Sequence, residues 1–303
     1  MIEPKKNTAA SVHQRLYNRA KESGEDFNLL LIRYANERFL YRLSISEYQN
    51  RFLLKGASLF ALWFAHPHRP TRDIDLLGFG SSEISEVETI FQNICTSETP
   101  SDDGLLFKAE SVKATEIKEG QEYGGVRINL AAFLGKARIS LQIDVGFGDA
   151  VSPEPETVTF PTVLDFPAPI LRGYPKETVV AEKFEAAVKL GMLNSRMKDF
   201  WDLSVLIAEF EFDGAQLQRA IRATFERRQT RFPSKLPTAL TEEFSGDSGK
   251  QTQWNAFLRK NKLLSRSDFK DLIAFLGKFF TKIIEAENEK QTLVERWRQG
   301  GWR

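Results

Sequence analysis

The chain has 303 residues, with 42 Lys and Arg against 41 Asp and Glu and a formal net charge of +1. A chain of this length forms one large domain or two ordinary ones, and the balanced charge excludes attraction of nucleic acid through an overall basic field. The single cysteine excludes an internal disulfide framework, and one cysteine with three histidines argues against a structural zinc site.

The sequence also predicts where the protein works. Its first residues, MIEPKKNTAAS, lack the apolar core of a signal peptide, and no uninterrupted apolar run approaches the length of a membrane span. One unpaired cysteine is compatible with a reducing compartment. We therefore expect a soluble cytoplasmic protein that makes no contact with a membrane.

Residues 8–50 are predicted to be helical. Thr8 or Ser11 can cap a first helix, and Asp26 can cap a second helix after a polar break. Ser44–Glu47 has the character of the start of a short third helix. Four arginines of this region are interpreted as a solvated helix face, and contact with RNA, which salt would weaken, is the alternative. They are Arg33, Arg38, Arg42 and Arg51.

The stretch Phe52–Gly78 has the pattern of a phosphate-binding turn followed by a pair of carboxylates. An apolar run breaks at Gly56–Ser58, and a turn containing proline and histidine leads to a short strand-like run with Asp73 and Asp75. Because side chains two apart in a strand point to the same face, the two carboxylates are predicted to project together. Small residues in the turn allow backbone N–H groups and the Ser58 hydroxyl to approach a phosphate.

The spacing of these two carboxylates indicates a divalent cation. Two carboxylates held close together repel each other unless a cation lies between them. Mg²⁺ commonly binds one or two carboxylates together with substrate phosphates. We therefore predict that Asp73 and Asp75 hold Mg²⁺ beside a nucleotide phosphate. The alternative is a strand, turn and helix with a surface Asp pair beside Arg69 and Arg72.

A helix and three strands are predicted next along the chain. Ser81–Cys95 is amphipathic with helical spacing, and Thr99–Gly104 is a polar turn. Glu116–Glu122 is predicted to be a loop, and Leu134–Lys136 a tight hairpin. The three predicted strands are Leu105–Ala114, Tyr123–Phe133 and Ala137–Val145.

The last of these strands carries a candidate third carboxylate. Apolar residues alternate with polar ones along it, so Gln142 and Asp144 point to the face opposite the core. From the alternation alone, Asp144 is equally well interpreted as an acid at a strand end that faces water or as a third metal ligand. Both interpretations stay open at this point.

The segment Ser152–Pro175 contains six prolines and is predicted to separate two domains. Because proline is excluded from helix interiors and from central strands, we expect a crossing segment with edge strands only. Beyond it, residues 232–249 are predicted to be a loop and nearly everything else to be helical. The predicted helices are 176–194, 198–210, 213–228, 251–260, 266–287 and 289–299.

A lysine and two acids of the helical part form a second candidate group. Lys183 lies next to a buried apolar stripe, from which its point charge can reach a triphosphate. Asp199 and Asp202 are three apart on a helix that begins near Lys198, so they share a face. The alternative is a surface lysine on an amphipathic helix, with Asp199 as a helix N-terminal acid that the helix dipole favours.

These motifs resemble those of the AbiEii toxin family, the nucleotidyltransferases of bacterial type IV toxin–antitoxin and abortive-infection pairs. Lys55–Leu59 (KGASL) resembles the Lys-Gly-Gly-Thr motif of the family, although Ala57 stands where the family usually has Gly or Ser. Arg69–Leu76 (RPTRDIDL) resembles its Arg-x-Ser/Thr-x-Asp-Ile-Asp-Leu motif. The run AEK that ends at Lys183 and the run RMKDFWDL that starts at Arg196 resemble the motifs that complete its site.

The resemblance implies a fold and a set of site residues. The expected fold is α/β (α+β), with a nucleotidyltransferase-like mixed sheet and flanking helices followed by a helical C-terminal domain. We expect residues 1–170 to form the nucleotidyltransferase domain with a helical lead-in, and residues 171–303 to form the helical domain that completes the active-site cleft. The implied site residues are Asp73, Asp75 and Asp144 for Mg²⁺, Gly56, Ser58 and Arg69 for phosphate, Lys183 for the triphosphate, and Asp199 or Asp202 to orient Lys183 or activate the acceptor.

The resemblance also implies an activity. It predicts a Mg²⁺-dependent nucleotidyltransferase toxin that transfers NMP from an NTP to RNA, with tRNA as the expected RNA, or to a protein hydroxyl. A cognate antitoxin is the implied partner. The identity of the NTP and the choice between RNA and protein stay open. The alternative is a non-catalytic nucleotide-binding module or partner scaffold of the same fold. A kinase-like phosphotransferase is disfavoured because the sequence has no Gly-x-x-x-x-Gly-Lys-Ser/Thr loop.

Overall fold

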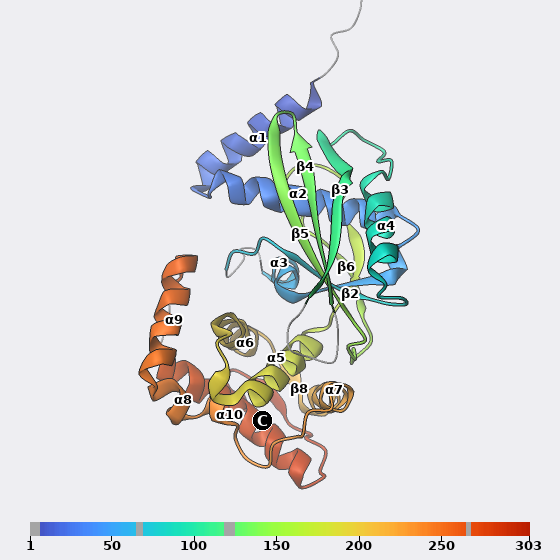
Figure 1. Cartoon of the computed structure of the whole chain (residues 1–303). Helices are drawn as coiled ribbons and strands as arrows, with labels where there is room; N and C mark the ends of the chain where they lie inside the picture. The colour runs from blue at the N-terminus through green and yellow to red at the C-terminus, as the bar shows by residue number, and fades with distance from the viewer. Residues whose placement is uncertain (1–6, 65–68, 118–124, 265–267) are drawn as a thin grey trace, which may run out of the picture. The chain divides into compact units, whose positions relative to one another are not determined.

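The computed structural model comprises two compact units (Figure 1). It describes residues 7–64, 69–117, 125–264 and 268–303. Unit 1 contains Met1–Gly148 and Glu156–Gly173, and unit 2 contains Asp149–Pro155 and Tyr174–Arg303. The segment Asp149–Pro155 therefore leaves unit 1 after its central strands and packs with unit 2 before the chain returns to unit 1.

Unit 1 is built on a seven-stranded sheet with the order β3-β4-β5-β2-β1-β7-β6. β2 is parallel to β5 and β1 is parallel to β7, whereas the other neighbouring pairs are antiparallel, so the sheet is mixed. With its flanking helices and the helical second unit, this sheet confirms the predicted fold class. The strands are β1 (Phe52–Lys55), β2 (Ile74–Gly78), β3 (Leu105–Ile117), β4 (Gly125–Leu134), β5 (Ala137–Phe147), β6 (Glu156–Thr159) and β7 (Ile170–Gly173).

β5 follows the predicted alternation, since Ile139, Leu141, Ile143 and Val145 are buried. The predicted hairpin between β4 and β5 is confirmed, because Gly135 has a φ of +60° and Leu134 pairs with Ala137 across the turn. β7 departs from the expectation of edge strands only, since it lies between β1 and β6. The predicted loop Glu116–Glu122 falls largely outside the described residues, as do residues 65–68 of the turn that contains proline and histidine.

The helices of unit 1 begin and end at identifiable caps. The side chain of Asn7 accepts a hydrogen bond from the Ala10 amide and caps the first helix, so the prediction of Thr8 or Ser11 is wrong. The predicted Asp26 cap is confirmed by its hydrogen bond from the Leu29 amide. The predicted third helix is replaced by a 3-10 turn, Gln49–Arg51. The helices are α1 (Thr8–Ser23), α2 (Phe27–Ile45), α3 (Phe60–Trp63) and α4 (Ile84–Cys95), and a second 3-10 turn is Gly56–Leu59.

Two arginines of α2 are buried, which corrects both interpretations of these residues. α2 packs against β5, β7 and α4, and nearly all sides of its second half are buried. Arg38 is 1% exposed and donates to the Pro167 carbonyl at 2.7 Å. Arg42 is 6% exposed and donates twice to the Asp103 carboxylate, at 2.7 and 3.1 Å. Their charges are compensated inside unit 1 and face neither solvent nor RNA.

Unit 2 is mainly helical, and its core is rich in phenylalanine. The Phe184 and Phe280 rings stack with centroids 4.1 Å apart and join two of its helices. The predicted loop 232–249 contains a 3-10 turn, Thr238–Leu240, and a short helix. The helices are α5 (Lys176–Leu190), α6 (Met197–Glu209), α7 (Gly214–Arg227), α8 (Glu242–Gly246), α9 (Ser248–Asn261) and α10 (Phe269–Asn288), and a further 3-10 turn is Gly191–Leu193.

The predicted last helix, residues 289–299, is wrong. This part of the chain contributes to a small sheet with the order β10-β9-β8. The Trp297 side chain is fully buried, donates from its indole N–H to the Ile207 carbonyl at 2.8 Å, and packs on Phe279. The strands are β8 (Phe212–Asp213), β9 (Arg296–Arg298) and β10 (Gly301–Trp302).

Candidate active site

Four charged residues of unit 1 lie side by side across neighbouring strands. In the register of the sheet Lys55 on β1 pairs with Asp75 on β2, and Asp75 pairs with Asp144 on β5. Asp144 in turn pairs with Arg127 on β4. Directly paired residues of neighbouring strands present their side chains on the same face of the sheet. Lys55, Asp75, Asp144 and Arg127 therefore form a continuous line, here called the charged row.

The predicted turn at Gly56 packs against the middle of the charged row. Gly56 has a φ of +68°, a conformation that residues with a Cβ rarely adopt. A Cβ atom built on Gly56 would lie 2.0 Å from Asp75 Oδ2, well inside van der Waals contact. The carboxylate of Asp75 thus occupies space that only glycine leaves open, and glycine is required for two independent reasons. Ser58, the other predicted phosphate residue of the turn, is 5% exposed.

The predicted pair Asp73 and Asp75 flanks the fully buried Ile74, as the strand alternation requires. Asp73 lies one residue before β2 and is exposed, whereas Asp75 lies within the strand and is partly buried. Arg69, also predicted at the site, is partly exposed, and its guanidinium lies 3.4 Å from the Pro70 carbonyl.

Asp144, the predicted third metal ligand, is held by an arginine that the sequence interpretation missed. Arg127 donates from Nε to Oδ1 and from Nη2 to Oδ2, both at 2.8 Å, which is a bidentate pair. The Asp144 side chain is 22% exposed and that of Arg127 is 39% exposed. Counting back along both strands from the observed two-residue turn Gly135–Lys136 places Arg127 opposite Asp144, whereas the predicted three-residue turn Leu134–Lys136 would have placed Val126 there.

The donor set of unit 1 fits a magnesium ion that completes its shell with phosphate and water. Within 7–64, 69–117, 125–264 and 268–303, no three His, Cys, Asp or Glu side chains are grouped closely enough to hold a metal by themselves. Mg²⁺ does not require such a cage, since one or two carboxylates plus substrate phosphates suffice. Asp73 and Asp75 are two such carboxylates, whereas both oxygens of Asp144 contact Arg127.

In unit 2 the predicted lysine lies between both predicted acids. Lys183 Nζ on α5 is 2.5 Å from Asp199 Oδ1 and 3.0 Å from Asp202 Oδ2, both on α6. The side chains are 13%, 10% and 0% exposed for Lys183, Asp199 and Asp202. The sequence left open which acid accompanies the lysine, and the structure brings both to it. These three residues are here called the lysine cluster.

A second ionic group, also missed from the sequence, fixes the far side of α5. Arg228 contacts Asp149 at 3.0 Å, Glu182 at 3.2 Å and Glu185 at 2.9 Å. Burial acts to lower the pKa of Arg228, but the nearby carboxylates outweigh it and raise that pKa. Burial, and then the charges of Glu182 and Asp149, raise the pKa of Tyr174 in the same group. This group ties the segment Asp149–Pro155 to the helix that carries Lys183.

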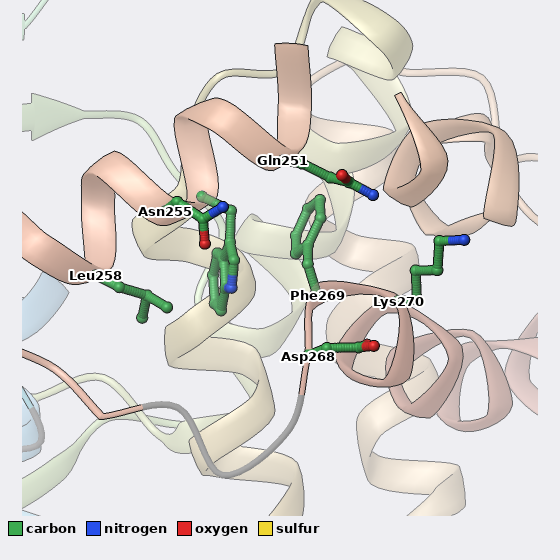
Figure 2. A pocket seen from close by; sticks show the side chains of 7 residues that line it. Gln251, Asn255, Leu258, Asp268, Phe269 and Lys270 are labelled. Atoms are coloured by element: carbon green, nitrogen blue, oxygen red, sulfur yellow. The ribbon is translucent and has the colours of Figure 1, made fainter. Parts of the chain in front are cut away.

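A separate hollow of unit 2 lies between α9 and the start of α10 and has a volume of about 330 Å³ (Figure 2). Figure 2 shows the Phe269 ring at its centre, with Gln251, Asn255 and Lys270 around it. None of the predicted site residues lines it. The hollow is therefore distinct from the lysine cluster.

Unit 1 thus places a glycine turn against a strand carboxylate on a mixed sheet, and unit 2 places a lysine between two acids. A family model described as "Nucleotidyl transferase AbiEii toxin, Type IV TA system" matches residues 38–275. This range is well over half of the 303 residues, and the chain therefore belongs to this family of nucleotidyltransferase toxins. The resemblance of its motifs is thereby confirmed, and a type IV system implies an antitoxin as partner.

Other comparisons add distant similarities. JHP933 from Helicobacter pylori is 16% identical over 84% of this chain and 90% of that chain, with a TM-score of 0.46. A second Helicobacter pylori structure is 16% identical over 84% of this chain and 93% of that chain, with a TM-score of 0.45. Among curated proteins there is no match. No helix of the described part of the chain has the length and apolar character needed to cross a membrane.

Proposed function

We propose that this protein is a Mg²⁺-dependent nucleotidyltransferase toxin that transfers NMP from an NTP to RNA, with tRNA as the expected RNA, and that a cognate antitoxin neutralises it. The observation that supports this proposal most directly is the charged row, in which Asp75 lies between the Gly56 turn and Asp144. A carboxylate that is fixed against a tight glycine turn is the arrangement needed to hold a cation next to a phosphate.

In the proposed reaction a hydroxyl oxygen of the acceptor attacks the α-phosphorus of the NTP, and the bond from that phosphorus to pyrophosphate breaks. Asp73 and Asp75 would hold Mg²⁺, which would neutralise the charge that grows on the leaving pyrophosphate. Gly56 and its neighbours would place backbone N–H groups against the phosphates. Arg69 would add a planar donor fork for phosphate oxygens.

The lysine cluster is proposed to supply a second positive charge and a proton acceptor. Lys183 would bind a phosphate of the triphosphate as a point charge. Asp202 is fully buried and would hold Lys183 in place. Asp199 is more exposed than Asp202 and is therefore the better candidate to accept the proton of the acceptor hydroxyl.

RNA is favoured as the acceptor by the surface of α9. Its sequence, SGKQTQWNAFLRKN, contains no acidic residue, although acids and bases are balanced over the whole chain. Arg259 and Lys260 in its last turn and Lys262 after it are exposed. A basic stretch of helix with no acidic residue of its own suits a phosphate backbone. Arg38 and Arg42 are buried and therefore cannot form such a basic surface.

The test is incubation of the protein with each α-labelled NTP, Mg²⁺ and total cell RNA or lysate. We expect label in RNA with one preferred NTP, and no label when Asp75 is replaced by Asn. Label in protein would assign a protein acceptor instead. No label with any NTP, from protein whose thermal melt shows it folded, would favour a non-catalytic nucleotide-binding module.

A further inference from the structure

We propose that Arg127 is a further site residue whose guanidinium competes with the divalent cation for Asp144. When the cation binds, Arg127 is released and becomes available to the phosphates of the nucleotide. This inference rests on the proposed function, because it concerns the same cation and the same nucleotide. Arg127 is a positioning residue for Asp144 before the cation binds and a phosphate ligand afterwards.

The first step of the argument is the geometry of the Asp144 carboxylate. Both of its oxygens accept a hydrogen bond from Arg127 at 2.8 Å, and the Gln142 amide lies 3.5 Å from each of them. A bidentate pair with a guanidinium is among the strongest contacts that a carboxylate makes in a protein. A divalent cation that binds the same oxygens would be close to the positive guanidinium, and the two cations would repel each other.

The second step is the distribution of charge along the row. Two carboxylates, Asp75 and Asp144, are direct partners on parallel strands, and like charges in such positions repel. The row places a positive residue at each end, Lys55 beside Asp75 and Arg127 beside Asp144. A divalent cation would compensate the two carboxylates and would thereby weaken the attraction between Asp144 and Arg127.

The third step is that Arg127 is accessible. Its side chain is 39% exposed, in contrast to the buried Arg38 and Arg42 of the same unit. Main-chain pairing of β4 with β5 holds the two strands together independently of this side-chain pair, so the pair can open without loss of the sheet. A freed guanidinium keeps its planar donor fork, which matches phosphate oxygens.

The experiment measures binding of Mn²⁺ alone, as a probe for the divalent cation, by titration calorimetry in the absence of nucleotide. We expect Arg127→Gln to strengthen Mn²⁺ binding by several-fold, because the competitor is removed. Arg127→Lys keeps the charge and should bind Mn²⁺ much as the wild type does. Arg138→Gln, at an exposed arginine that faces Phe133 in the register, is the matched control and should leave Mn²⁺ binding unchanged.

A double-mutant comparison assigns the effect to Asp144. In an Asp144→Asn background, Arg127→Gln should no longer strengthen Mn²⁺ binding, since the shared carboxylate is gone. Binding of Mg²⁺–NTP should weaken in Arg127→Gln, opposite in sign to the change for the metal alone. Unchanged or weaker Mn²⁺ binding in Arg127→Gln, with an unchanged thermal melt, would overturn the inference. Metal binding needs no transfer, so a protein that fails the labelling test can still show the effect of Arg127.

Discussion

The charged row and the lysine cluster show two ways to hold charged side chains in one protein. The row lies on a sheet, where the backbone pairing of β1, β2, β5 and β4 sets the order of its residues. The lysine cluster joins two helices through ion pairs of 2.5 and 3.0 Å between largely buried side chains. The row is positioned by hydrogen bonds of the main chain, whereas the cluster is positioned by its own charges.

This difference predicts how each group responds to substitution. A side chain of the row can lose its charge while the strands keep their pairing. Such a substitution should therefore lower activity without lowering the free energy of unfolding. Removal of a charge from the lysine cluster breaks an ion pair between largely buried side chains, which costs folding free energy. Four predictions test or sharpen this contrast, beginning with the largest expected effect.

The largest effect is expected for Asp75→Asn, because the change removes a ligand charge but hardly any volume. Loss of cation binding costs several kcal/mol of transition-state stabilisation, so the single-turnover rate should fall on the order of a thousandfold or more. The thermal melt should stay at the wild-type value. Asp165→Asn, at a carboxylate that is 98% exposed, is the control and should change neither quantity. A wild-type rate for Asp75→Asn would contradict the proposed role of the row.

Lys183→Met should impair both transfer and folding. The methionine keeps most of the apolar stem but removes the positive charge that lies between the carboxylates of Asp199 and Asp202. The free energy of unfolding should fall by about 3–5 kcal/mol, measured by urea denaturation. NTP affinity should weaken and the single-turnover rate should fall further. Asp199→Asn should keep NTP affinity near the wild-type value while turnover drops.

The double variant Lys183→Met/Asp202→Asn checks that these residues act as one group. Its loss of unfolding free energy should be smaller than the sum of the two single losses, because the buried acid is neutralised together with its partner. Full additivity, or wild-type turnover in Lys183→Met, would return α5 to a packed amphipathic helix without a role at the site.

A buried acid of unit 1 outside the charged row provides a smaller effect with a defined pH window. Glu37 is fully buried on α2 and accepts a hydrogen bond from the Val163 amide. Burial raises the pKa of Glu37 to about 7 from its usual 4.5. A raised pKa means that the folded protein favours the protonated acid, so its contribution is complete below pH 4.5 and is lost as the pH rises through 7.

Glu37→Gln should remove this part of the pH dependence. Between pH 4.5 and pH 7 the wild type should lose about 2–3 kcal/mol of unfolding free energy that the variant does not lose, since one pKa unit corresponds to about 1.4 kcal/mol. Urea denaturation at several pH values measures both curves. Because Glu37 lies outside the row, NTP transfer per folded molecule should be unchanged. Parallel curves for the two proteins would contradict a raised pKa.

The smallest effect is expected for the surface of α9. Reversal of two exposed charges, Arg259→Glu with Lys260→Glu, should weaken RNA binding about tenfold at physiological salt and flatten its salt dependence. The control is Lys235→Glu with Lys290→Glu, which makes the same change of net charge at other exposed positions of unit 2. Equal losses for both double variants would show that only net charge matters and would remove α9 as an RNA surface.

Much of the fold was predictable from local patterns. The alternation in Ala137–Val145 placed Asp144 on the polar face of a strand, and the run Leu134–Lys136 with its glycine predicted the β4–β5 hairpin. Asp26 is a helix cap in the sequence and in the structure. These features depend on residues close together in the chain, where propensity and periodicity decide the outcome.

The tertiary structure decided what depends on distant partners. Pairing of β2 with β5 makes Asp75 and Asp144 neighbours although nearly seventy residues separate them in the chain, and no local pattern encodes that register. The burial of Arg38 and Arg42 required Asp103 and the Pro167 carbonyl, which periodicity along α2 cannot reveal. The strands at the end of the chain form because Trp297 is buried against other elements of unit 2.

The candidate site also combines features that the sequence predicted with features that only the tertiary structure decided. The wording and order of the motifs resembled those of the family and pointed to Asp73, Asp75, Lys183 and the two acids of α6. Only the folded chain brought both Asp199 and Asp202 to Lys183 and set Arg127 on Asp144. The physical reason is that an ion pair needs two side chains within a few ångströms of each other, and strand register and helix packing, which are properties of the whole fold, decide which charges meet.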